Sequence, residues 1–68
     1  MAYADWQQRV IDEVNELDAK RQKLVDFIHN NPQYLKLSTV DRDLLIMQVN
    51  NMMHYSITLH SRIERFKT

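Results

Sequence analysis

The sequence predicts an all-α fold, an antiparallel two-helix hairpin that assembles into a helical homo-oligomer. Its 68 residues contain no glycine and one proline, so few residues oppose helix formation. Apolar residues recur at spacings of three, four and seven on both sides of Pro32. A chain this short, without cysteine for disulfides, needs regular packing or partner subunits to be stable.

The first helix is expected over residues 4–30, approximately. Asn30, Asn31 and Pro32 are typical stop signals, because a residue before proline disfavours the α conformation. The helix places its apolar stripe along one side. That stripe consists of Val10, Val14, Leu17, Leu24 and Ile28.

A loop of about residues 31–38 precedes the second helix, expected over about 39–66. Ser38 is a typical N-cap, and Asp41 three residues later completes a variant of the capping box. The stripe of this helix is Leu45, Val49, Met52, Ser56, Leu59 and Ile63. The short connection predicts antiparallel neighbours, and residues 1–68 form a single helical-hairpin domain.

Arg21 stands at the centre of the first apolar stripe, where an aliphatic residue is expected. Pairing the helices about the loop places it opposite Gln48 and Val49. A buried guanidinium needs a partner, and three remain open. It can pair with a carboxylate of another subunit, such as Glu13 or Glu16, or bury its stem with its head in water. It can also bind a ligand phosphate; the first two together are favoured.

Apolar residues also lie outside the two stripes, so two helices alone cannot enclose them. Ile11 and Val25 lie beside the first stripe, and Ile46, Met53 and Ile57 beside the second. The opposite flank of the second helix carries Leu44, Gln48, Tyr55, Arg62 and Phe66. Exposed apolar area of this kind predicts self-association or another protein partner.

Composition and motifs argue against several classes of function. Nine basic and nine acidic residues leave no net charge, so DNA or RNA binding is not expected. No apolar run is long enough for a membrane span, and no signal peptide is visible. The chain lacks catalytic and metal-binding spacings, so no enzyme activity, cofactor or metal is expected. A cysteine-free chain suits the cytoplasm.

Both helices match one extended pattern. In "QRVIDEVNELDAKRQKLVDFI" the matching residues are Arg9, Val10, Glu13, Leu17, Lys20, Lys23, Leu24, Phe27 and Ile28. In "LLIMQVNNMMHYSITLHSRI" they are Leu44, Leu45, Gln48, Met52, Tyr55, Ser56, Leu59, Arg62 and Ile63. With these residues in register, the chain from about Trp6 to Phe66 resembles the helical-hairpin family of phage sponges. Those sponges counter CBASS and Thoeris, bacterial defence systems that signal with cyclic nucleotides.

The resemblance implies a homohexamer of hairpins that sequesters cyclic oligonucleotides without cleaving them. Cyclic dinucleotides lie in pockets between protomers, and in some members cyclic trinucleotides occupy separate pockets near three-fold axes. For the dinucleotide pocket the resemblance implies that Trp6 and a basic residue bind the ligand. The basic residue is Arg21, or alternatively Lys20 or Lys23. Position 21 is usually aliphatic in the pattern, so Arg21 indicates an altered pocket or a different register.

For the trinucleotide pocket the resemblance implies Arg62, with help from Gln8 or Arg9. Trp6 by itself has a commoner interpretation as a core or interface anchor. The expected function is therefore a phage anti-defence sponge for cyclic oligonucleotides, acting in the bacterial host cytoplasm. The alternative is a small helical oligomer that serves as a protein–protein interaction module and binds no nucleotide.

Overall fold

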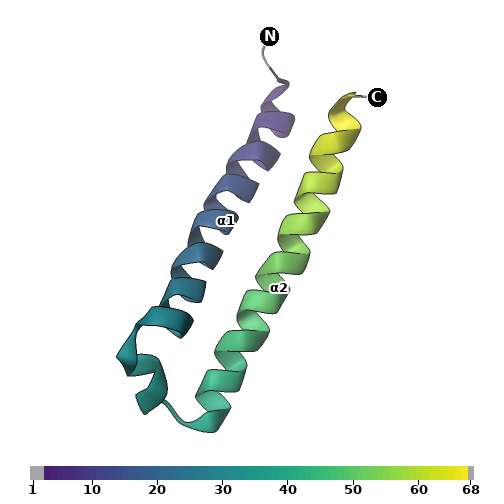
Figure 1. Cartoon of the computed structure of the whole chain (residues 1–68). Helices are drawn as coiled ribbons and strands as arrows, with labels where there is room; N and C mark the ends of the chain where they lie inside the picture. Colours follow the sequence, from purple (N-terminus) through teal and green to yellow (C-terminus); the bar gives the residue numbers. More distant parts are fainter. Residues whose placement is uncertain (1–2, 68) are drawn as a thin grey trace.

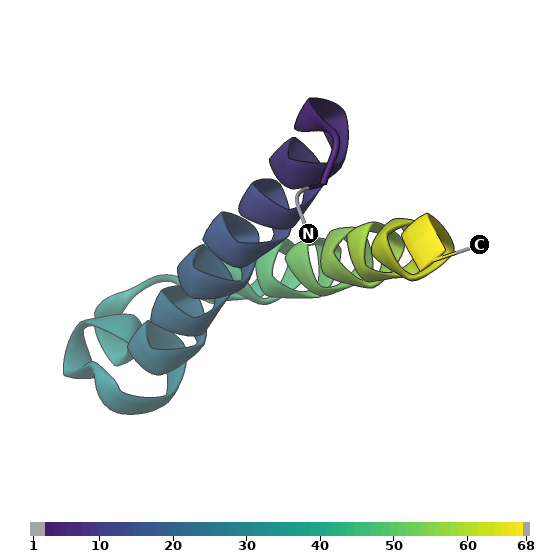
Figure 2. The ribbon, with the colours of Figure 1, turned by 90° about the horizontal axis from the view of Figure 1, so that it is seen from above.

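The computed structural model describes residues 3–67 and forms a helical hairpin 48 × 16 × 14 Å in extent. Helix α1 (Asp5–Asn30) and helix α2 (Thr39–Glu64) are antiparallel, so both ends of the chain lie at one end of the molecule (Figure 1). Seen from above, the two axes cross at an angle (Figure 2). The all-α hairpin that the sequence predicts is thus confirmed.

Short polar contacts fix both ends of α1. The side chain of Gln7 accepts a hydrogen bond from the backbone N–H of Ala4 at 3.0 Å. At the other end, Asn31 Oδ1 accepts from the backbone N–H of Gln33 at 2.9 Å. This Asx turn leads directly into a 3₁₀ helix, η1 (Pro32–Lys36), where proline at the first position suits the turn. The expected loop is therefore largely helical.

Helix α2 begins at the predicted cap. Ser38 Oγ accepts a hydrogen bond from the backbone N–H of Asp41 at 3.1 Å. The α-helix ends at Glu64, earlier than residue 66, because its last residues tighten into the 3₁₀ helix η2 (Arg65–Lys67). A 3₁₀ turn is a common way to finish an α-helix, since it satisfies terminal carbonyl groups.

The two predicted stripes form the seam between the helices. Burial is deepest near the open end of the hairpin, where the chain ends meet, and Leu59 of α2 is only 1% exposed. The core consists of Val10, Val14 and Leu59, with Leu17, Ile63 and Phe66 packed against it. Towards η1 the seam residues are only half-buried. Such a small core gives a lone hairpin little stability.

Helix α2 also carries large apolar side chains on its outer sides. We define the apolar face as Ile11 and Val25 of α1 with Ile46, Met53 and Ile57 of α2. The three residues of α2 are exposed, whereas the two of α1 are half-buried. Among residues 3–67, neither helix is long and apolar enough to cross a bilayer.

Candidate functional site

The open end of the hairpin holds a hollow of about 360 Å³ that combines an aromatic ring with basic side chains. Its lining residues are Trp6, Gln7, Arg62, Arg65 and Phe66. The Trp6 ring meets Phe66 edge to face, with centroids 5.2 Å apart, and remains 53% exposed. An exposed indole beside a guanidinium can stack a nucleobase while the guanidinium binds a phosphate.

The antiparallel topology creates this hollow. Trp6 lies in the first turns of α1 and Arg62 in the last turn of α2, and the antiparallel helices bring these turns to the same end of the molecule (Figure 1). Phe66 follows in η2 and packs against the buried core. Tyr3 contacts the same ring, with centroids 6.2 Å apart. Aromatic packing therefore holds the end of the chain beside the start of α1.

A second hollow, of about 450 Å³, lies further along the hairpin. Its lining residues are Lys20, Lys23, Leu24, Phe27, Gln48 and Met52. Lysine side chains at its border can bind a phosphate, and the apolar residues can support a base or a ribose. It therefore has the chemistry expected of an anionic ligand site.

Both hollows lie on the same side of the hairpin. Gln48, from the second hollow, and Arg62, from the first, are fourteen residues apart on α2, a spacing that returns to the same face of a helix. We define the basic face as Trp6, Lys20 and Lys23 of α1 with Gln48 and Arg62 of α2. Trp6 and Lys20 are separated by about 21 Å along α1, so one small ligand cannot contact both within one chain.

The structure therefore groups the predicted site residues differently from the sequence. Trp6, predicted to act with Arg21, lies beside Arg62 instead. Gln8 donates to Asp12 at 3.0 Å, and its neighbour Gln7 lines the hollow with Arg62. Arg9 is exposed on α1. The assignment of Trp6, Gln8 and Arg9 to pockets stays a prediction.

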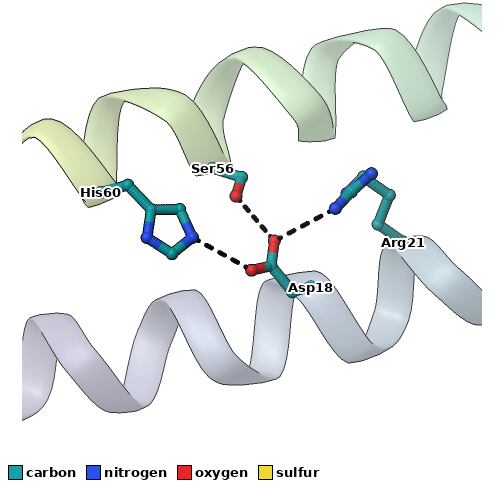
Figure 3. Close-up of polar contacts among 4 residues, drawn as sticks. All are labelled: Asp18, Arg21, Ser56 and His60. Carbon is teal, nitrogen blue, oxygen red and sulfur yellow. Dashed lines mark hydrogen bonds and ion pairs between the residues drawn. The ribbon is translucent and has the colours of Figure 1, made fainter.

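A polar cluster bridges the helices at the centre of the seam (Figure 3). Ser56 Oγ donates a hydrogen bond to Asp18 Oδ1 at 2.6 Å, and His60 Nε2 lies 3.2 Å from Asp18 Oδ2. Arg21 Nη2 lies 3.6 Å from Asp18 Oδ1. A single carboxylate thus contacts all three polar side chains, two of them on the opposite helix.

The same contacts shift the ionisation of the carboxylate. The hydrogen bond from Ser56 is the largest influence and lowers the pKa of Asp18 below its ordinary value. Partial desolvation raises this pKa, but the added contacts with His60 and Arg21 leave it lowered. The folded hairpin therefore favours the ionised form of Asp18.

The contacts of Asp18 with Ser56 and Arg21 correct the predicted position of Arg21. Arg21 is half-buried in the seam, as its place in the stripe predicts, but it does not lie opposite Gln48. Its carboxylate partner, Asp18, belongs to its own helix. Because Asp18 faces Ser56, the two helices are offset by about one turn from the predicted pairing.

The physical reason for this offset is the connection. The segment η1 continues beyond the end of α1 before the chain turns back, so α2 begins further out (Figure 1). Five residues of 3₁₀ helix add roughly 10 Å. The predicted pairing of Arg21 with Gln48 assumes that both helices end at the same level at the loop. The connection through η1 does not meet this condition.

Sequence reasoning missed Asp18 and His60. Asp18 lies beside the stripe at a position that reads as surface charge, and His60 has no metal-ligand spacing. One feature of the sequence could have revealed them: each of the two apolar stripes contains a polar residue, Arg21 in the first and Ser56 in the second. Two such interruptions indicate a shared partner, because each must satisfy its hydrogen bonds when buried. Among residues 3–67, no cluster of His, Cys, Asp or Glu could hold a metal ion.

The Asp18 contacts predict a pH-dependent loss of stability in one variant. Asp18→Asn should reduce the free energy of unfolding by about 1 kcal/mol at pH 7, because a hydrogen bond to a partly exposed charged group is lost. A lowered pKa in the folded state stabilises it above the unfolded value of about 4, and this contribution is lost as the pH falls. Urea unfolding followed by circular dichroism should show wild type and variant converging as the pH falls through the lowered pKa of Asp18 in the folded state.

Asp26→Asn is the matched control for that comparison. Asp26 is an exposed residue of α1 that accepts a hydrogen bond from Gln22, one turn earlier, at 3.1 Å. Removing its charge should change stability little, since isolated surface pairs contribute less than about 0.5 kcal/mol. Equal losses in both variants, or a difference that persists unchanged at low pH, would contradict the assigned role of Asp18.

Comparison with known proteins gives one match. The family model described as Sequestin matches residues 4–65, which cover nearly the whole hairpin. Neither the curated proteins nor the solved structures yield a match. The matched range includes both helices, the polar cluster, and Trp6 and Arg62 of the hollow at the open end.

Proposed function

Because this chain belongs to the Sequestin family, we propose that it is a phage anti-defence sponge that binds cyclic oligonucleotide second messengers and does not cleave them. It acts in the cytoplasm of the bacterial host, where it keeps the free messenger below the concentration that activates the defence effector. The family description agrees with sequestration. The resemblance of both helices to the phage sponges supplies the ligand class.

The observation that carries the proposal is the meeting of Trp6 and Arg62 in one hollow at the open end. Cyclic oligonucleotides are anionic and carry flat bases, and this pair offers one group for each feature. An aromatic plane contributes about 1–3 kcal/mol per stacked base. A guanidinium binds a phosphate through two parallel hydrogen bonds.

Assembly would complete both hollows of the basic face. Each hollow is open to solvent, and Trp6 is about half exposed, so a single hairpin covers only part of a ligand. We expect a homohexamer in which neighbouring copies close the two hollows. Light scattering should then give a mass near six times 8.2 kDa. In that assembly the Lys20 and Lys23 hollow takes the dinucleotide, and the Arg62 hollow takes the trinucleotide.

The arrangement of polar groups supports binding without cleavage. Ser56 is buried and donates its hydroxyl hydrogen to Asp18 rather than to His60. A serine nucleophile needs an adjacent base to accept its proton and space for the substrate. This serine is buried in the seam, and the carboxylate that accepts its hydrogen has a lowered pKa and is a weak base, which favours a sponge over a hydrolase.

Calorimetry against a panel of cyclic di- and trinucleotides tests the proposal. A sponge must hold scarce messengers, so we expect dissociation constants of roughly 1 nM, about −12 kcal/mol. Ligand recovered after heat denaturation of the complex should be intact by chromatography. The absence of heat with any cyclic nucleotide, using folded oligomer, would refute ligand binding, and recovery of linear products would refute the sponge.

A second candidate function rests on the exposed apolar side chains. Ile46, Met53 and Ile57 could bind a different protein, in which case the hairpin is an interaction module without a nucleotide ligand. Capture of a stable protein partner by purified hairpin that gives no heat with cyclic nucleotides would favour this function.

A further inference from the structure

The apolar face is one side of the hairpin, opposite the basic face. Asp18 lies midway between Ile11 and Val25 on α1, seven residues from each, and so shares their side of that helix. His60 is likewise seven residues from Met53 on α2. Asp18 and His60 contact each other (Figure 3). Both rows therefore lie on the same side of the molecule.

The exposed surface area of the hairpin indicates how much of it a partner molecule could cover. Its accessible area is 5400 Å². A compact folded monomer of 8.2 kDa exposes about 4,500 Å². The hairpin therefore exposes roughly 900 Å² more than a compact monomer does. A standard interface between two proteins covers about 800 Å² on each partner, which matches this excess.

The pattern along α2 fits a second copy of the same helix in the opposite direction. Spacings of seven and four residues place Ile46, Met53 and Ile57 on one continuous ridge along the helix. A two-fold axis between residues 51 and 52 sets Ile46 of one copy against Ile57 of the other, and symmetry makes this contact twice.

The polar pair beside this ridge is compatible with such an arrangement. Asp18 and His60 already contact each other within one chain, so covering them leaves neither without a polar partner.

The basic face suits self-pairing less well. A two-fold contact through that face would remove the charged groups of Lys20, Lys23 and Arg62 from water, which is costly unless each of them finds a partner. The contact through the apolar face avoids this cost and leaves both hollows to the ligand.

We propose that the apolar face is the two-fold contact between two copies of this chain, with α2 packed antiparallel on α2 and Ile46 opposite Ile57. This inference rests on the self-association included in the proposed function and is independent of the ligand. The basic face points away from this contact and remains accessible for ligand.

Cysteine cross-linking can map the contact, because the chain contains no natural cysteine. The test variant carries Ile46→Cys and Ile57→Cys, and the matched control carries Leu44→Cys and Tyr55→Cys on the basic side with the same spacing. Residues eleven apart on one helix are about 16 Å distant, too far for a disulfide within the chain. At micromolar protein the test pair should cross-link roughly 100-fold faster, because the two-fold contact holds positions 46 and 57 of the two copies opposite each other at a millimolar effective concentration.

Single substitutions provide a second test. Ile57→Arg should raise the dissociation constant of the two-fold contact about 100-fold or more, because it places an unpaired charge in the interface. Met47→Arg, at an equally exposed position (57% for both), should leave the mass from light scattering unchanged. Circular dichroism on both variants checks that the helices persist.

The outcomes separate this inference from the proposed function. A wild-type chain that stays at 8.2 kDa would overturn both the contact and the expected hexamer. Faster cross-linking of the 44/55 pair, or an unchanged assembly for Ile57→Arg, would overturn the contact alone. Calorimetry with cyclic nucleotides then decides ligand binding independently of either result.

Discussion

Replacing Arg62 by alanine is expected to weaken binding of cyclic trinucleotides by about 10- to 150-fold, and to leave cyclic dinucleotide binding largely intact. A charge-assisted hydrogen bond to a phosphate contributes about 1.5–3 kcal/mol, which corresponds to that range. Arg62 is exposed and lies outside the buried core, so its loss should not unfold the hairpin. Calorimetry with both ligand classes measures the effect.

Trp6 supplies a matched second variant. Because Trp6 lies in the same hollow as Arg62, Trp6→Ala should weaken the same ligand, by about 1–3 kcal/mol for a lost base contact. The double variant should show coupling between the two changes, since both residues act on one ligand. The resemblance to the phage sponges implies a different pairing, of Trp6 with Arg21.

Lys20→Ala is the control from the other hollow and should reduce only dinucleotide binding. Each variant must keep the wild-type mass by light scattering, because Trp6 can also contribute to assembly. The separation of the two ligand classes is wrong if intact Arg62→Ala oligomers lose both equally. Agreement of Trp6→Ala with Lys20→Ala, and not with Arg62→Ala, would restore the grouping that the sequence suggested.

Local signals were sufficient to predict the helices. The absence of glycine, the stop at Asn30 and Asn31, and the Ser38 cap each act over a few residues. The two stripes then specify which sides meet, because spacing along a helix determines direction. Each of these features depends on residues that are close together in the chain, so a single sequence is enough to predict them.

The relative shift of the two helices could not be obtained in the same way. It depends on whether residues 32–36 form a compact loop or continue as a 3₁₀ helix, a choice of a few torsion angles. An error of one turn placed Arg21 opposite Gln48 and changed the apparent ligand residues. Site composition in a hairpin therefore depends on the connection more than on either helix.

The polar cluster shows how a stripe can contain Arg21 and still pack. Arg21 and Ser56 interrupt opposite stripes, and Asp18 contacts Ser56 across the seam and Arg21 on its own helix. Since a purely apolar seam can slide by one turn at little cost, we infer that this cluster specifies the register. The hollows of the basic face then depend on it, because they are lined by residues from both helices.

Leu59→Ala is expected to have the largest effect on stability of any single truncation in this chain. Leu59 is 1% exposed and packs against Val10 and Val14 at the centre of the core. Truncating a buried leucine costs about 2–5 kcal/mol, from lost transfer free energy and the cavity that remains. In a domain of this size that corresponds to a fall in Tm of about 10–30 °C, measured by circular dichroism during heating.

Leu35→Ala removes the same atoms from a residue of η1 that is 71% exposed, so its Tm should stay close to wild type. Both variants must be compared at equal protein concentration, because assembly makes Tm depend on concentration. A fall in Tm of only a few degrees for Leu59→Ala would contradict the seam as the source of stability. It would indicate instead that contacts between copies, and not the core of each hairpin, hold the helices together.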